Sequence, residues 1–325
     1  MKNQVWFQQR QILIVILLLI VFIGNCNQEC QAQKNQLKVS QRDSIIIKTA
    51  KLIKDNYVFK DVGNKISKEL LKNHRQGVYK NIYSLDDIIG LLQNTILEIS
   101  EDKHFEIRMI GSNNDQDDDE PNMLSQHGFK KIEILNDNIA YFEFDHLPGS
   151  ENDLEFAGGV ISDHSYCKAI IFDVRENIGG SGDLVIYLCS YLFKDSLLLF
   201  TFHNQEGEVI FEAKTTPPDS NELTQLSEIP VYVLIGPNTL SAGESLAYIL
   251  KHFNRATIVG EVSAGMAHPS RTFRIDDLIY LTIPFIRFEH PNTGTDWEGN
   301  GVIPDIQVKA DSALNAALND LRNKE

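Results

Sequence analysis

The stretch Pro230–Leu250, PVYVLIGPNTLSAGESLAYIL, leads from a continuous apolar run through a Gly-Pro-Asn loop into a helical pattern. Two further runs, KAIIFDV at Lys168–Val174 and ATIVGEV at Ala256–Val262, are also apolar at successive positions. Strands that are apolar on both faces are typical of a parallel sheet covered by helices. Helical patterns follow the first two runs along the chain, beginning at Gly182 and Ala242. The sequence therefore predicts an α/β domain built on a parallel sheet.

Other segments around these runs read as strands and as a closing helix. KKIEIL and IAYFEFDHL alternate in hydrophobicity and are joined through Asn136-Asp137-Asn138, which predicts an antiparallel pair. SLLLFTFHNQEGEVIFEA predicts a hairpin, more strands are expected between Arg271 and Phe288, and SALNAALNDLRNK predicts a last helix. Because this part of the sequence shows no internal repeat and no flexible linker, we expect residues 126–325 to form one α/β domain.

Residues 34–110 predict a small N-terminal bundle of about three helices. Ile46, Ala50 and Ile53 follow a helical period, and Ser84 precedes a segment with an apolar face, where it is expected to cap the helix. The acidic segment SNNDQDDDEPN then marks a linker at residues 111–125. This segment lacks the glycine and the terminal glutamate of a calcium loop, so we interpret it as a solvated connection.

Residues 1–33 resemble an export signal. Lys2 and Arg10 come before the apolar run Ile12–Ile23, whose 12 residues are few for a membrane span and typical of a signal peptide. Cleavage after Ala32 is one expectation, lipidation of Cys26 is a second, and retention as an uncleaved membrane anchor is a third. The first two predict an exported protein, periplasmic or extracellular, which lipidation would attach to the membrane.

The composition excludes some classes of function. A net charge of −15 argues against binding to nucleic acid, which needs a basic surface. Cys167 and Cys189 lie in apolar contexts, where they either pair in an exported protein or remain buried thiols. Because no Cys/His spacing resembles a zinc site, we predict neither a metal nor a cofactor.

The unusual residues collect in the loops that follow the three apolar runs. These loops are Arg175–Gly180, Pro237–Ser241 and Glu261–Gly265. Ligands of open α/β sheets bind beyond the carboxyl ends of the strands. The sequence therefore predicts a functional site where these loops meet.

Ser241 has two interpretations. With Glu244 it forms the pattern of a capping box, in which the serine caps the helix. It also suits a nucleophile, because the amino end of a helix offers unpaired N–H groups, and the Ala242 amide would lie close to an oxyanion. Gly179 and Gly180 are either a tight turn or a second oxyanion donor.

A serine nucleophile needs a base. Lys251 lies ten residues further along the same helix as Ser241, about 15 Å away along the axis, and cannot serve. Two histidines lie near unusual loops, His104 in EDKHFEI and His268 in GMAHP. The residues alone do not choose between them.

Four segments in order resemble the carboxy-terminal-processing, or tail-specific, serine protease superfamily. The likeness is strongest to the branch that holds tricorn protease core domains and interphotoreceptor retinoid-binding-protein modules. It covers roughly residues 43–308. The segments that carry it are EDKHFEI, FDVRENIGGSGD, TLSAGESLAYILKHFNRATIVGEVSAG and DWEGNGVIPDIQV.

The resemblance implies a crotonase- and Clp-protease-like core of β-β-α units. It implies that Ser241 is the nucleophile, that His104 is the general base and that Glu298 orients the histidine. The amides of Ala242 and of Gly179 or Gly180 would form the oxyanion hole. Without the resemblance, Glu298 is an acid in a Gly-rich loop, which is usually solvated.

The sequence departs from relatives at three points. Met266 stands where relatives with a Ser-Lys dyad have lysine, so the histidine version is favoured. Lys103 stands where tricorn-like enzymes have a serine before the catalytic histidine. There is also no room for a PDZ domain between the helical segment and the core.

These observations predict an exported serine endopeptidase that acts on peptides or unstructured protein segments. The alternative is a non-catalytic module that binds an apolar ligand or a peptide on the same fold. An acyl-CoA enzyme of the crotonase type is disfavoured by the signal segment and by the negative charge. Cleavage specificity and oligomeric state are not predicted by the sequence.

Overall fold

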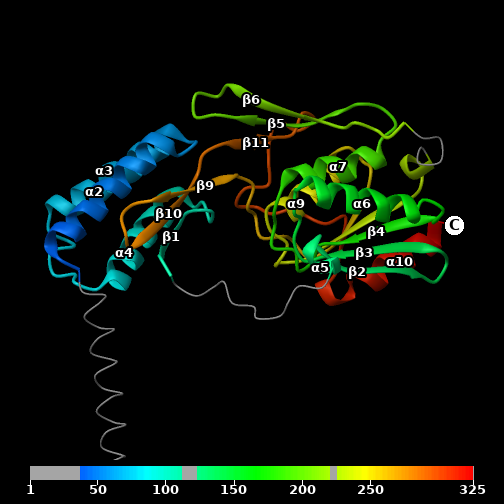
Figure 1. Ribbon diagram of the computed structural model, residues 1–325, viewed down its shortest axis with the longest axis horizontal. Coiled ribbons are helices and arrows are strands. Elements are labelled where there is room, and N and C mark those ends of the chain that lie inside the picture. The colour runs from blue at the N-terminus through cyan, green and yellow to red at the C-terminus, as the bar shows by residue number, and fades with distance from the viewer. Residues whose placement is uncertain (1–36, 112–122, 220–224, 325) are drawn as a thin grey trace, which may run out of the picture.

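The computed structural model describes residues 37–111, 123–219 and 225–324. The expected export segment 1–33, with Cys26, and most of the linker expected at 111–125 lie outside these residues. Figure 1 shows a helical unit on the left, an α/β unit on the right and a small sheet along the top. Within the described ranges, no helix is both long and apolar enough to span a membrane.

A six-stranded sheet forms the centre of the α/β unit. Neighbouring strands pair in parallel from β12 to β3, and β2 is antiparallel to β3, as the KKIEIL and IAYFEFDHL segments predicted. The sheet confirms the expected α/β class. Its order is β12 (Ile306–Gln307), β8 (Thr257–Gly260), β7 (Val231–Ile235), β4 (Ala169–Asp173), β3 (Ile139–Phe144) and β2 (Phe129–Leu135).

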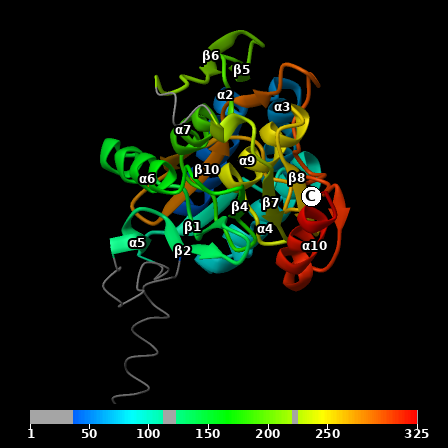
Figure 2. The same ribbon diagram turned by 90° about the vertical axis from the view of Figure 1, so that its right-hand side faces the viewer.

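Helices cover both faces of this sheet, which explains the unbroken apolar runs. Ile170 and Phe172 of β4 belong to the core shared with one group of helices, whereas Ile171 belongs to a second core shared with α10 (Ala313–Lys324). Figure 2 shows α10 on the side of the sheet away from α6 and α7. The first group comprises α6 (Glu151–Asp163), α7 (Gly182–Leu192) and α9 (Ala242–His252).

The helical unit contains the expected three helices and a sheet of three strands. The helices are α2 (Val39–Asn56), α3 (Lys60–Arg75) and α4 (Leu85–Ser100), and Ser84 caps α4 by accepting from the Asp87 amide. The strands, in order, are β1 (Glu106–Met109), β10 (Ile279–Pro284) and β9 (Ser270–Arg274).

Strands β9 and β10 lie within the range expected for the α/β domain, yet they complete the helical unit. The alternate residues Ile279, Leu281 and Ile283 are fully buried in the same core as the helices. Alternation in a sequence shows that one face of a strand is covered, but not by which part of the chain. The division of the chain at residue 110 remains a prediction.

The predicted hairpin forms the middle and one edge of a third sheet, which bridges the two units in Figure 1. Its strand order is β11 (Arg287–Glu289), β5 (Leu198–His203) and β6 (Val209–Lys214). Aromatic rings gather on it: Phe200 stacks on Phe288 with centroids 4.7 Å apart, and Phe202 stacks on Phe211. The remaining short elements are α5 (Met123–Gln126), η1 (Gln225–Ser227) and η2 (Ala310–Ser312).

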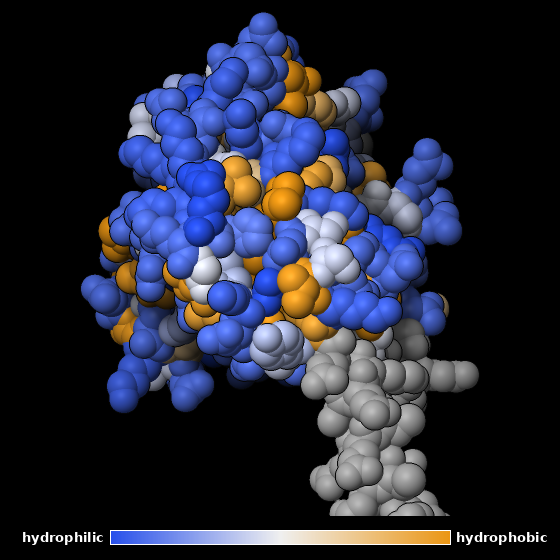
Figure 3. Space-filling model, turned by 90° about the vertical axis from the view of Figure 1, so that its left-hand side faces the viewer, coloured by the Kyte–Doolittle hydropathy of each residue, from blue (hydrophilic) through white to orange (hydrophobic). Residues whose placement is uncertain are grey.

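Within the described ranges, Cys167 and Cys189 are buried free thiols, the second of the two expectations. Burial raises the pKa of the Cys189 thiol to about 12, so this side chain is an inert part of the core. On the helical end of the molecule, Figure 3 shows hydrophobic side chains dispersed among hydrophilic ones.

Shortening the buried Leu246 of α9 tests how far the fold depends on the packing between α9 and the sheet. Leu246 is fully buried, so Leu246→Ala is expected to lower the free energy of unfolding by about 2–5 kcal/mol in urea titrations. Ile303 is 60% exposed, and Ile303→Ala is the control with an expected change below about 0.5 kcal/mol. Equal losses in both variants would contradict this account of the core.

Candidate active site

Ser241 precedes α9 in a backbone conformation that a simple helix cap does not need. Ser84, Ser150 and Ser181 cap their helices with extended backbones, and each accepts a hydrogen bond from a helix amide. Ser241 instead has φ of 46° and ψ of −108°, although it takes part in the expected capping box with Glu244. A serine in this conformation is strained, and such strain concentrates at functional sites.

The buried carboxylate of Glu244 holds this conformation in place. It accepts hydrogen bonds from the amides of Ser241 at 2.9 Å, Gly265 at 2.6 Å and Met266 at 2.9 Å. It also accepts from the hydroxyl of Ser263 at 2.6 Å. Burial raises the pKa of Glu244, while these four donors oppose the rise. Glu244 therefore ties the serine to the loop after β8, which goes beyond the role in a capping box that its sequence position predicted.

The two candidate glycines of the oxyanion hole differ in their surroundings. The Gly179 amide donates to the Asn177 side chain at 2.9 Å, so this N–H group is already engaged. Gly180 lines the pocket beside Ser241 and has φ of 136°, and a Cβ there would lie 2.1 Å from the Leu147 carbonyl oxygen. Gly179 lies against the serine, since a Cβ there would lie 3.1 Å from the Ser241 Cβ atom, so both glycines remain candidates for the oxyanion hole.

His104 reaches the site from the helical unit, on the loop between α4 and β1. The Asp102 carboxylate accepts from the His104 amide at 3.0 Å, a local turn that orients the histidine. The His104 Nδ1 atom lies 3.4 Å from Asp102 and 3.7 Å from Glu298. Among the described residues, both ring nitrogens of His104 lack a hydrogen-bond partner although they are buried. An imidazole with unused nitrogens is suited to accept and return a proton.

Glu298 lies behind His104 in the loop between β11 and β12. Its Oε2 atom accepts from the Ala267 amide at 2.6 Å, and its Oε1 atom is buried without a partner in the described structure. Burial raises the pKa of the Glu298 carboxyl, an effect that the nearby His268 opposes. The carboxylate is thus enclosed in the protein, in contrast to a solvated acid of a glycine-rich loop.

His268, the other candidate base, is surrounded by acids. Burial alone would lower its pKa, but the hydrogen bond to Asp102, with Asp296 and Glu298 nearby, raises it to about 9. Near neutral pH this ring is therefore an imidazolium and has no lone pair to accept a proton.

The ligand atoms of Asp102, His104 and Glu298 lie within 4.8 Å of one another, a spacing compatible with a divalent cation. Because the His268 cation already contacts both carboxylates, we assign the group to acid–base chemistry.

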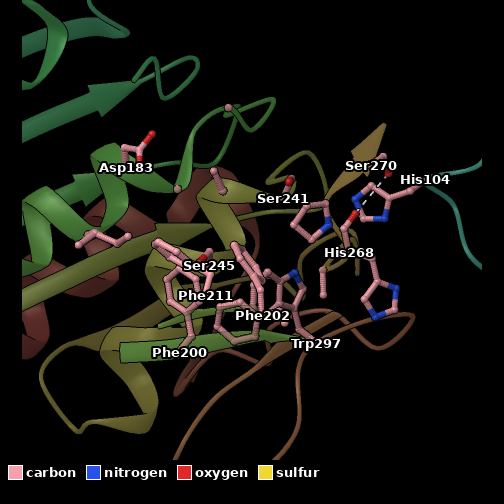
Figure 4. Close-up of a pocket in the computed structure, with 17 residues that line it drawn as sticks. His104, Asp183, Phe200, Phe202, Phe211, Ser241, Ser245, His268, Ser270 and Trp297 are labelled. Atoms are coloured by element: carbon pink, nitrogen blue, oxygen red, sulfur yellow. Dashed lines mark hydrogen bonds between the residues drawn. The ribbon is translucent and has the colours of Figure 1, made fainter. Parts of the chain in front are cut away.

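A pocket of about 590 Å³ connects these residues. Ser241, Ala242 and Gly180 line it together with His104. The His104 ring and the Ser241 hydroxyl face this space without a hydrogen bond to each other, in keeping with catalytic contacts that tighten when substrate binds. Figure 4 shows aromatic rings gathered below Ser241 and the two histidines to its right. The labelled rings are Phe200, Phe202, Phe211 and Trp297.

Lys103 and Lys251, which the sequence analysis considered, both form contacts away from Ser241. Lys103, in the place of the serine of tricorn-like enzymes, donates to the Ala264 carbonyl at 2.7 Å and so connects the histidine loop to the loop after β8. Lys251 pairs with Asp305 and donates to the Ile303 carbonyl at 2.9 Å. Neither ammonium group is directed at Ser241.

Comparison with known proteins places this chain in a family. Residues 139–308 match the model of peptidase family S41, and residues 36–143 match the N-terminal domain of peptidase S41 in eukaryotic IRBP. The chain belongs to peptidase family S41. This confirms the family resemblance that the four sequence segments indicated.

Curated relatives of this S41 chain are longer than the chain itself. Carboxyl-terminal-processing peptidase 2, chloroplastic, of Arabidopsis thaliana is 29% identical over 138 residues, or 42% of this chain and 25% of the relative. The carboxy-terminal-processing protease of Bartonella bacilliformis is 29% identical over 143 residues, or 44% of this chain and 31% of the relative. The similarity thus spans about a quarter to a third of these proteins.

Solved structures extend the likeness in fold over most of the S41 chain. A candidate peptidase from Parabacteroides merdae has a TM-score of 0.63 at 18% identity and covers 86% of this chain and 96% of that one. The tricorn protease has a TM-score of 0.57 at 14% identity and covers 87% of this chain and 37% of that one. At these identities the comparison supports the fold.

Sequence reasoning missed two parts of the S41 site. Asp102 approaches His104 Nδ1 more closely than Glu298 does, and its position two residues before the histidine was the available signal. The second part is the aromatic wall of the pocket, which comes mainly from the hairpin β5–β6 and from β11. No sequence motif links these segments to Ser241. The wall consists of Phe200, Phe202, Phe211, Phe288 and Trp297. Pairing of the strands within the third sheet brought the rings on these strands together.

Glu244→Gln tests whether the buried carboxylate holds the serine loop. An amide at this position would turn an NH₂ group toward two of the four donors, so the variant is expected to lose about 2–4 kcal/mol of unfolding free energy. Glu98 is exposed on α4, and Glu98→Gln is the matched control with little expected change. Unfolding in urea measures both, and an unchanged stability of Glu244→Gln would refute the network.

Proposed function

We propose that this protein is an exported serine endopeptidase that hydrolyses peptides or unstructured protein segments. The observation that carries the proposal is the strained Ser241 at the amino end of α9, in one pocket with His104, whose buried ring nitrogens have no hydrogen-bond partner in the described parts of the chain. Family membership supports the reaction class. The apolar run Ile12–Ile23 supports export, by cleavage or by lipidation at Cys26.

In the proposed reaction, His104 accepts the hydroxyl proton of Ser241 as the serine oxygen attacks the peptide carbonyl carbon. The amides of Gly180 and Ala242 stabilise the resulting oxyanion. His104 then returns its proton to the leaving amine as the peptide C–N bond breaks and leaves an acyl-enzyme. Water, deprotonated by the same histidine, hydrolyses the ester and regenerates Ser241.

Glu298 is the proposed partner that stabilises the protonated His104. Its carboxylate lies 3.7 Å from the Nδ1 atom of His104. His268 does not compete as the base, because its raised pKa keeps it protonated near neutral pH. The proposed arrangement is therefore Ser241, His104 and Glu298.

The same pocket supports a second candidate function, the binding of an apolar ligand without catalysis. Its aromatic residues, with Ile186 of α7, form an apolar lining that would suit such a ligand. The strain at Ser241 favours catalysis, because an apolar ligand requires no strained serine.

Labelling with a fluorophosphonate probe tests the catalytic proposal. The wild-type chain is expected to be labelled, because the probe reacts with an activated serine, and both Ser241→Ala and His104→Ala are expected to lose labelling by at least about a hundredfold. Circular dichroism checks that the variants fold. Glu98→Gln is the matched control and is expected to label like the wild type.

Each alternative result has a distinct meaning. A His104→Ala variant that still labels would remove His104 from the role of base. A folded wild-type chain that neither labels nor cleaves unfolded casein, but binds a fluorescent fatty acid, would support the apolar-ligand function and contradict the peptidase.

The aromatic wall of the pocket predicts which side chain of a peptide substrate the pocket binds. Peptides with Phe or Leu before the cleaved bond are expected to be hydrolysed with a kcat/KM about 10–200-fold above matched peptides with Ser there, because an apolar side chain gains about 1–3 kcal/mol on burial in such a pocket. Phe202→Ser is expected to reduce this preference, whereas Phe193→Ser, outside the pocket lining, is not. Equal rates for both peptides would contradict this assignment.

A further inference from the structure

His268 lies where three distant segments of the chain meet. Its ring is 2% exposed and comes from the loop between β8 and β9. The Nδ1 atom lies 3.2 Å from Asp102 and 3.4 Å from Glu298, and the Nε2 atom lies 3.5 Å from Asp296. Asp102 belongs to the helical unit, whereas the other two acids belong to the loop before β12. One buried imidazole thus contacts carboxylates from both units.

The two acids that share the His268 Nδ1 atom are the same two that approach His104. Asp102 faces His104 through its Oδ1 atom and His268 through its Oδ2 atom, which also accepts from the Tyr57 hydroxyl at 3.1 Å. Glu298 approaches both histidines through its Oε2 atom. The rings of the two histidines lie 6.4 Å apart between centroids. The carboxylates therefore approach two histidines that both line the pocket of Ser241, of which His268 is the more deeply buried.

We propose that His268 is a positioning residue, whose buried imidazolium holds Asp102 and Glu298 together so that both carboxylates face the Nδ1 atom of His104. Asp102 is accordingly a second acid partner of the base, beside Glu298. This inference deepens the proposed function and rests on it, because it assigns a role relative to His104.

Charge explains why a cation is needed at this position. Two buried carboxylates that approach one atom repel each other, and without a counter-ion one of them takes up a proton or turns away. Asp296 adds a third negative charge, and its Oδ1 atom accepts from the Glu298 amide at 2.9 Å. The neighbouring Phe59 ring, 5.1 Å from His268 between centroids, offers no charge. The adjacent His104 and His268 side chains hold the pKa of Asp102 well below its usual range despite its burial.

The pH dependence of fluorophosphonate labelling tests the proposal in the full chain. As pH rises through about 9, His268 loses its proton, the two acids lose their counter-ion, and the wild-type labelling rate is expected to fall with that midpoint. His268→Gln cannot titrate, so it is expected to label at least about tenfold more slowly at pH 7.5 and at a constant rate between pH 8 and 10. Asp102→Asn is expected to slow labelling at pH 7.5 as well.

Two results would overturn the proposal. One is a His268→Gln variant that is labelled at the wild-type rate. The other is a variant that is labelled more slowly but whose labelling rate still falls with rising pH near pH 9, as in the wild type. The second would mean that His268 is structural only.

Histidine NMR of the wild-type chain decides the matter even if His268→Gln does not fold, and it does not depend on serine reactivity. One imidazolium is expected to titrate near pH 9, with a lower midpoint in Asp296→Asn, because this carboxylate lies 3.5 Å from the ring. If no histidine of the folded wild type keeps its proton above pH 8, the proposal is wrong. A wild-type chain that is never labelled refutes the peptidase, whereas the NMR result still reports on the His268 cation.

Discussion

The parallel sheet, buried on both faces, is the constraint on which the rest of this structure depends. Helices cover β4, β7 and β8 on each side, so the side chains of these strands are almost all buried. Only the loops beyond the strand ends reach solvent. The candidate site residues that follow these strands therefore lie in the loops at the carboxyl edge. There the Gly180 loop, Ser241 and the Glu244-bound loop are held by a core that tolerates little displacement.

The helical unit completes the site that the sheet begins. The loops of the sheet provide the strained serine and the glycine beside it, whereas His104 comes from the loop after α4. The two parts meet through buried charge: Asp102 on one side, Asp296 and Glu298 on the other, and the His268 ring between them. Apolar packing sets the shape of each unit, while this ionic contact sets how His104, the proposed base, is placed relative to Ser241, the proposed nucleophile.

Local pattern explains what the sequence predicted well. The runs around Ile171, Val233 and Ile258 are apolar at successive positions because both faces are buried, and a serine before an apolar helix is a strong signal for a helix start. The chemistry at Ser241, His104 and Glu298 was inferred from likeness to a family, since spacing alone left the base undecided. Phe200, Phe211 and Trp297 could not be assigned to the pocket, because no motif links the predicted hairpin to Ser241 and because the pairing of β5 with the distant β11 is not visible in the sequence.

The route of the chain through β9 and β10 has a consequence for how this fold can be divided. The chain leaves the sheet after β8, adds two strands to the helical unit, and returns through β11 to the hairpin sheet. A fragment that began at residue 123 would carry Ile279, Leu281 and Ile283 with no helices to cover them. The helical unit is therefore not a portable module: recombination that exchanged it alone would separate β1 from its partner, and a viable exchange would have to carry both segments at once.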